Sequence, residues 1–166
     1  MACRTLAELR RRLPDLETPF PGSPFTTSEI SFCDTPILSR KNRRSVFYFV
    51  EAMTALGDFN DQTGGQLTLS EDENFLQFGP GMTAVFPAGT TEYMFAAVGK
   101  GEKRYMFRQY FCAGVHRWIE KGGRTDKEFA EEAPEQEVLA WEEMRLRRAE
   151  QSAKMFTKLQ VLEELH

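Results

Sequence analysis

The 166-residue sequence predicts an α+β fold in which a double-stranded β-helix (jellyroll) is flanked by an N-terminal helix and a long C-terminal helix. Three observations support this prediction. Between Thr54 and Trp118, short alternating runs are separated by turns that contain Gly, Pro or Asp, which is typical of an antiparallel sheet closed on itself. Leucines at helical spacing precede this region, and a long amphipathic pattern follows it. A chain of this length can bury a core without metal or disulfide support.

The expected strands are defined by alternation and by the turns between them. The run Val-Phe-Tyr-Phe-Val at residues 46–50 is too continuously apolar for a solvent-exposed strand, so we expect it to be part of a buried one. The full set of expected strands is 29–32, 46–55, 66–69, 75–78, 83–86, 93–98 and 104–111.

Helices are expected at both ends of the chain. Residues 4–13 carry leucines at helical spacing, and Pro14 ends this pattern. Thr125 can cap a short helix, and residues 135–165 carry an apolar stripe that we expect to dock on the sheet. The sequence therefore divides into an N-terminal helix with a connector, a β-helix core, and a C-terminal helical extension packed on that core: residues 1–28, 29–120 and 121–166.

Composition favours an intracellular protein. The net charge of −4 favours neither nucleic acid nor membrane globally. Cys3, Cys33 and Cys112 are odd in number and widely spaced, so we expect buried or free thiols in a reducing compartment. No signal peptide opens the sequence and no apolar run approaches the length of a membrane span. The expected location is the cytoplasm or nucleus, with no membrane partner.

Several short motifs, spread over most of the chain, carry a family resemblance. They are Pro19–Phe25, Thr54–Phe59, Gly64–Leu67, Pro80-Gly81, Phe86-Pro87, Glu102–Tyr105, Gln109-Tyr110, Arg117-Trp118, Met155-Phe156 and Leu162–Leu165. In these the sequence resembles the 2-oxoglutarate/Fe(II) oxygenase-like proteins of mushroom-forming basidiomycete fungi. That family is related to the ten-eleven-translocation and base J-binding dioxygenases, which oxidise methylated nucleobases.

The resemblance implies an iron held by two histidines and one carboxylate, but the matching positions of this sequence lack those ligands. The His-x-Asp pair falls at Arg40 and Asn42, and the distal histidine falls near Tyr93. A guanidinium has no usable lone pair, an amide is uncharged, and a phenol is a weak ligand while it is protonated. The two histidines of the chain, His116 and His166, lie in no such pair. We therefore expect neither Fe(II) nor 2-oxoglutarate as a cofactor, and we identify no catalytic or metal-ligating residue.

A charge at position 40 also opposes metal binding directly. At ~4 Å, and with an effective dielectric constant of about 20, a unit positive charge repels a dication by roughly 8 kcal/mol.

Arg104 matches the arginine with which the family grips the distal carboxylate of 2-oxoglutarate. The resemblance implies that Arg104 faces the same interior as Tyr93 and binds a dicarboxylate there. The alternative is a structural role, in which Arg104 pairs with an internal carboxylate or lies at the mouth of the barrel.

Three functions follow. The leading hypothesis is a catalytically degenerate dioxygenase-like protein that serves as a non-enzymatic binding or regulatory module. The second is an active nucleic-acid-modifying oxygenase with an unrecognised metal site. The third is a nucleic-acid-binding module that uses the basic cluster Arg40, Lys41, Arg43 and Arg44, although such a cluster can equally be a solvated loop. The sequence identifies no particular partner.

Overall fold

The computed structural model describes the chain except for residues 1, 17–19, 21, 33–36, 70–73 and 153–166. It divides into two compact units, residues 1–116 and 117–166. The predicted boundary after residue 120 lies within the second unit, at the end of the helix formed by Ala113–Glu120.

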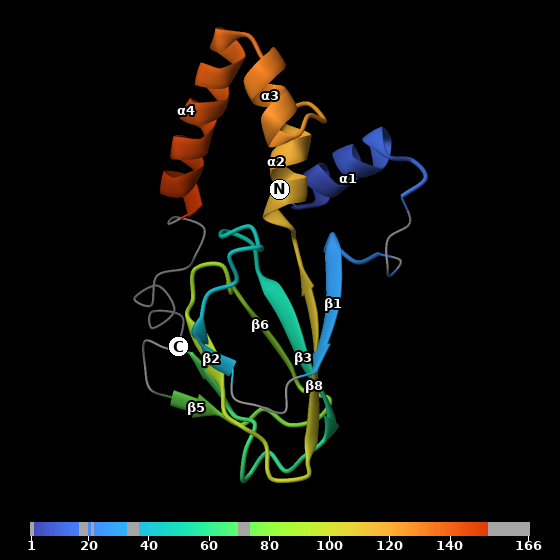
Figure 1. The fold of residues 1–166 in the computed structure, drawn as a ribbon, viewed down its shortest axis with the longest axis vertical. Coiled ribbons are helices and arrows are strands. Elements are labelled where there is room, and N and C mark those ends of the chain that lie inside the picture. The colour runs from blue at the N-terminus through green and yellow to red at the C-terminus, as the bar shows by residue number, and fades with distance from the viewer. Residues whose placement is uncertain (1, 17–19, 21, 33–36, 70–73, 153–166) are drawn as a thin grey trace, which may run out of the picture. The chain divides into compact units, whose positions relative to one another are not determined.

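The first unit contains two four-stranded antiparallel sheets, so the α+β prediction is confirmed. One sheet has the strand order β1-β8-β3-β6, and the other has the order β2-β7-β4-β5 (Figure 1). The strands are β1 (Thr27–Phe32), β2 (Ile37–Arg40), β3 (Glu51–Asp58), β4 (Leu67–Leu69), β5 (Asn74–Leu76), β6 (Thr83–Phe86), β7 (Tyr93–Phe95) and β8 (Lys103–Tyr110).

The core lies between the two sheets, because strands of both contribute to one buried cluster. Met53 and Met106 come from β3 and β8 of one sheet, whereas Leu67 and Phe95 come from β4 and β7 of the other. Each is at most 2% exposed. Burial of a side chain of this size contributes about 1.5–3 kcal/mol, so this shared cluster stabilises the packing of the sheets.

Alternation decides which side chains of β8 enter the core. Residues 104, 106, 108 and 110 are buried, whereas the residues between them are partly exposed. Because successive side chains of a strand point to opposite faces, two arginines of β8 point toward the same interior as Met106. β8 is central in its sheet and pairs with β1 and β3.

The expected strand at 46–55 is wrong over its first half. Residues 46–50 form a turn, in which the Phe49 N–H donates to the Val46 carbonyl at 3.0 Å, and β3 starts only at Glu51. The apolar side chains of residues 46–50 contribute to a buried cluster outside the sheets instead of to a strand. Phe49 and Phe111 pack in a second buried cluster with Val46 and Tyr48, and Tyr48 also hydrogen-bonds to His116 at 2.8 Å. A short apolar run in the sequence does not show whether its side chains are buried in a strand or in a turn.

Four helices are described. α1 (Ala2–Arg12) and α3 (Asp126–Glu132) confirm the short helices expected near the N-terminus and after Thr125, while α2 (Ala113–Glu120) was not predicted. Thr125 caps α3 through a capping box with Glu128. α4 (Glu135–Ser152) confirms the start of the expected long helix, whose remainder lies outside the described residues. Its packing on the core remains a prediction.

A buried lysine organises the second unit. Lys121 donates to the carboxylate of Asp126 at 2.7 Å and lies 4.4 Å from the ring centroid of Trp141 and 4.9 Å from that of Phe129. These contacts offset the cost of removing its charge from water. None of the described helices combines the length and apolar character needed to cross a bilayer.

Candidate functional site

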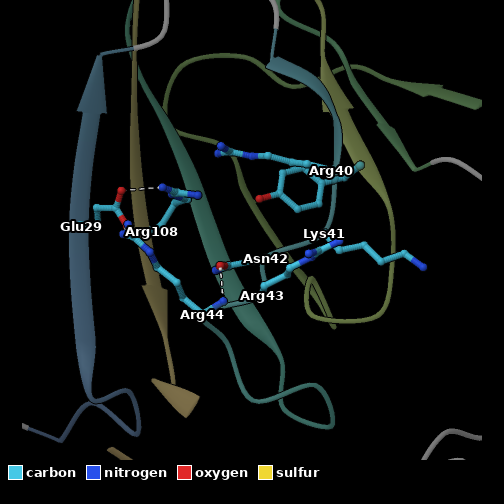
Figure 2. Close-up of a pocket in the computed structure, with 8 residues that line it drawn as sticks. Glu29, Arg40, Lys41, Asn42, Arg43, Arg44 and Arg108 are labelled. Atoms are coloured by element: carbon cyan, nitrogen blue, oxygen red, sulfur yellow. Dashed lines mark hydrogen bonds and ion pairs between the residues drawn. The ribbon is translucent and has the colours of Figure 1, made fainter. Parts of the chain in front are cut away.

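A basic pocket of about 350 Å³ lies in the first unit where β2 ends. Its walls come from β2 and the segment after it, from β7, and from β1 and β8 of the other sheet. The lining residues are Glu29, Arg40, Lys41, Asn42, Arg43, Arg44, Tyr93 and Arg108. Figure 2 shows Arg40 extending across this pocket toward the side occupied by Arg108, whereas Lys41 points away.

Arg40 and Tyr93 are register partners in the β2–β7 pair. The guanidinium carbon of Arg40 lies 5.9 Å from the centroid of the Tyr93 ring. Tyr93 is fully buried and packs edge-on against Phe86, with ring centroids 5.4 Å apart. The structure thus brings Arg40, Asn42 and Tyr93, the three positions that the resemblance assigns to metal ligands, around a single pocket.

Asn42 fixes the backbone of the basic segment. Its N–H donates to the Ala88 carbonyl at 2.7 Å, and its side-chain oxygen accepts from the Arg44 N–H at 3.1 Å. Its Nδ2 donates to Oε2 of Glu51 at 2.6 Å. With two hydrogen bonds from its side chain and one from its backbone N–H, Asn42 is held in one orientation. The cationic residues on either side of it are therefore positioned as well.

Glu51 is a fully buried carboxyl at the start of β3. Within the described part of the chain, its Oε1 has no hydrogen-bond partner. Burial raises the pKa of Glu51, although the hydrogen bond from Asn42 and the charge of Arg108 oppose this increase. The buried Glu51 carboxyl group therefore has an increased tendency to remain protonated.

Glu29 neutralises part of the positive charge. Nη2 of Arg108 donates to Oε1 of Glu29 at 2.6 Å, and Nη1 of Arg44 lies 4.0 Å from Oε2. Burial alone would lower the pKa of Arg108, but Glu29, Tyr93 and Glu51 outweigh that effect, so the pKa is raised. Arg108 is therefore a permanent cation despite being 8% exposed.

The other cations of the pocket are not neutralised in this way. Among the residues that the structure describes, Arg40, Lys41 and Arg43 form no ion pair with a carboxylate. Five cationic side chains line the pocket beside one carboxylate. Their combined field attracts anions.

Arg104, the predicted carboxylate-binding residue, lies outside this pocket. It is completely buried, and its Nη1 donates to the Ala96 carbonyl at 2.7 Å. Its guanidinium carbon is 5.4 Å from the ring centroid of Phe95, which in turn contacts the ring of Tyr93. Arg104 therefore shares an interior with Tyr93, while its binding of a dicarboxylate remains a prediction.

Sequence reasoning missed three residues of the site: Glu29, Glu51 and Arg108. Glu29 was assigned only to an expected strand, and its pairing with Arg108 depends on the β1–β8 register. Arg108 could have been found, because the alternation that buries Arg104 also buries the residue four positions later. Glu51 carried no signal, since a single carboxyl at the end of an apolar run belongs to no motif.

The residues of the pocket do not fit Fe(II). The Asn42 amide is engaged by Glu51 and the Glu29 carboxylate by arginines, which leaves the Tyr93 hydroxyl as the remaining neutral oxygen donor. Nowhere among the described residues do three or more His, Cys, Asp or Glu side chains gather as a metal would require. An oxygenase iron needs two imidazoles and a carboxylate on one face, and the lining residues of this pocket include no histidine.

The sequence matches no family model and no curated protein. Solved structures with a similar path of the chain include NgTET1 in complex with 5mC DNA, with a TM-score of 0.49 and 12% identity over 65% of this chain and 43% of that one. The viral collagen prolyl hydroxylase vCPH of Paramecium Bursaria Chlorella virus-1, in a 2OG complex, has a TM-score of 0.37 and 10% identity over 63% of this chain and 68% of that one. A cupin-2 domain containing protein of Shewanella frigidimarina has a TM-score of 0.32 and 10% identity over 65% of this chain and 97% of its own. The chain spans less than half the length of NgTET1.

Proposed function

We propose that the protein is a catalytically degenerate double-stranded β-helix protein of the 2-oxoglutarate/Fe(II) dioxygenase-like class, which binds a ligand without oxidising it. The strand orders β1-β8-β3-β6 and β2-β7-β4-β5 support the β-helix, because the chain passes repeatedly between two facing sheets as in a jellyroll.

One observation carries the loss of catalysis. Arg40 pairs in register with Tyr93 at the pocket around which the family resemblance places all three iron ligands, so a guanidinium occupies the position of one of them. Arg40 offers no lone pair and brings a positive charge. The same pocket retains volume and charge, so the surviving capacity is binding of an anion.

We expect no iron-dependent turnover. The purified protein, given Fe(II), 2-oxoglutarate and DNA with methylated bases, should release no more succinate than a reaction without protein. Reinstalling the ligands tests the assignment from the opposite direction. Arg40→His, Asn42→Asp and Tyr93→His, combined with Glu51→Gln, should introduce Co(II) binding, visible as absorption bands of the bound ion.

Glu51→Gln belongs in this variant because Asn42→Asp alone would place two carboxylates at the 2.6 Å contact now made by Asn42 and Glu51. The matched control omits only Arg40→His and should bind Co(II) at least tenfold more weakly. Succinate release that a chelator abolishes would refute the proposed loss of catalysis. A folded rebuilt variant that gains no Co(II) affinity would refute the assignment of the three positions.

Nucleic-acid binding is a second candidate function, supported by the exposure of Lys41, Arg43 and Arg44 at the same pocket. Each phosphate contact should contribute about one to the slope of log affinity against log salt. Fluorescence anisotropy with a single-stranded oligonucleotide should show a slope that decreases in Lys41→Gln and Arg43→Gln. Lys127→Gln, which changes an exposed cation of α3, is the control. Equal slopes in all variants would exclude this surface.

A further inference from the structure

Two buried donors of the pocket lack a partner. The Tyr93 hydroxyl and Nε of Arg108 have no hydrogen-bond partner within the described residues, although both side chains line the pocket. Tyr93 is 0% exposed and Arg108 is 8% exposed. A buried donor without an acceptor destabilises the folded state, because it has lost its hydrogen bonds to water. A ligand that supplies acceptors at this point would remove that destabilisation.

The cations approach the pocket from different elements. Arg40 belongs to β2 and Arg108 to β8 of the other sheet, while Lys41, Arg43 and Arg44 belong to the segment that Asn42 holds in place. A planar carboxylate is best matched by a single fork of donors in one plane. Donors arriving from three sides instead match an anion whose acceptor oxygens are distributed in three dimensions.

We propose that this pocket binds a phosphate dianion, either free or as the terminal monoester group of a small molecule, between Arg40 and Arg108, with the Tyr93 hydroxyl as a third donor. This inference rests on the proposed function, since it specifies the ligand of that same site. A phosphate monoester carries close to two negative charges at neutral pH and three strong acceptor oxygens. It therefore matches both the excess positive charge and the unsatisfied donors.

Glu29 acts as an internal competitor for the same cations. Its carboxylate contacts Arg108 at 2.6 Å and lies 4.0 Å from Arg44. The side chain of Glu29 is 30% exposed, so it can leave for water when an external anion arrives. Removing its charge should therefore increase the affinity for phosphate, whereas loss of a structural ion pair alone would leave that affinity unchanged or lower.

Calorimetric titration of the full chain with inorganic phosphate tests the proposal, with succinate and dimethyl phosphate as comparison anions at constant ionic strength near pH 8. We expect phosphate to bind at least tenfold more tightly than either. Arg40→Gln and Arg108→Gln should each weaken phosphate binding at least tenfold, and Tyr93→Phe should weaken it several-fold. Glu29→Gln should strengthen it several-fold, while Lys127→Gln should leave it unchanged.

The outcomes separate the explanations. Equal binding of succinate and phosphate would overturn the phosphate preference but leave a non-catalytic anion module intact. Equal or tighter binding of dimethyl phosphate would instead favour the backbone of a nucleic acid. Phosphate binding unaffected by Arg40→Gln and Glu29→Gln, in variants that unfold at the temperature of the unaltered protein, would exclude this pocket. Iron-dependent succinate release would refute the proposed function without bearing on these affinities.

Discussion

Phe95→Ala should lower the free energy of unfolding by about 3–5 kcal/mol, the usual effect of removing a buried aromatic ring. Phe95 is 2% exposed. Its ring centroid lies 5.6 Å from that of Phe78 and 5.9 Å from that of Tyr93, and the guanidinium of Arg104 lies over its face. The substitution therefore leaves a cavity and removes the aromatic face that helps to accommodate a fully buried charge. Urea unfolding of the full chain, followed by circular dichroism, measures the effect.

Phe95→Leu is the matched control, because it retains most of the apolar volume but not the aromatic face. We expect a smaller loss than for Phe95→Ala, and the remaining deficit reports the ring contacts with Arg104 and Tyr93. If Phe95→Ala loses less than about 1 kcal/mol, the ring does not lie at the centre of a closely packed core.

The second large effect is expected at Asn42, where Asn42→Ala should cost about 1–3 kcal/mol, the usual cost of leaving a buried polar group without its partner. Asn42 donates to the Glu51 carboxylate at 2.6 Å, and the other carboxylate oxygen has no partner among the described residues. After the substitution, Oε2 of Glu51 loses the hydrogen bond that it now accepts from Asn42. The substitution leaves the backbone hydrogen bond from residue 42 to the Ala88 carbonyl in place. The loss of stability therefore reports the hydrogen bonds of the Asn42 side chain.

This deficit should depend on pH in a defined direction. Burial raises the pKa of Glu51 from the ordinary value of 4.5, while the hydrogen bond from Asn42 lowers it. Because the folded state holds the proton more tightly than the unfolded state, stability falls as the pH rises from the ordinary pKa through the folded one. Asn42→Ala raises the folded pKa further. The variant's deficit should therefore be smallest below pH 4.5 and larger at pH 8.

Glu51→Gln supplies the control for this dependence. In that background, Asn42→Ala should show a deficit that no longer changes with pH, because no group at position 51 can ionise. Urea titrations at pH 5 and pH 8 on all four proteins complete the cycle. A deficit that is identical at both pH values in the Glu51 background would contradict the assigned role of this carboxyl.

The sequence was most informative where its periodicity was unambiguous. Residues 83–86 form a strand with the predicted bounds, and Thr125 caps a helix as expected. β2 was missed because its sequence, Ile-Leu-Ser-Arg, has two apolar residues followed by two polar ones and so shows no alternation. α2 was missed because it follows β8 within three residues, and its first turn contains Gly114, a poor helix former.

Prediction of the site followed the same logic. Matching motifs placed Arg40, Asn42 and Tyr93 together, and the structure has them around one pocket. The residues that contact these three positions come from distant parts of the chain, so a local sequence pattern does not identify them. Glu29 reaches Arg108 across 79 positions of sequence, through the pairing of β1 with β8. Glu51 meets Asn42 only because the turn at 46–50 folds back between them.

The contact between Asn42 and Glu51 also restricts the order in which this sequence can change. An aspartate introduced at position 42 while Glu51 is unchanged would bring two buried acids to hydrogen-bonding distance, and it would lose the donor that Glu51 now uses. Such an intermediate is viable only when one acid stays protonated. Lineages descended from this protein should therefore alter position 51 before an acid is tolerated at position 42. One buried hydrogen bond thus makes the substitutions tolerated at position 42 depend on the residue at position 51. Positions 42 and 51 should therefore vary together among close relatives of this protein.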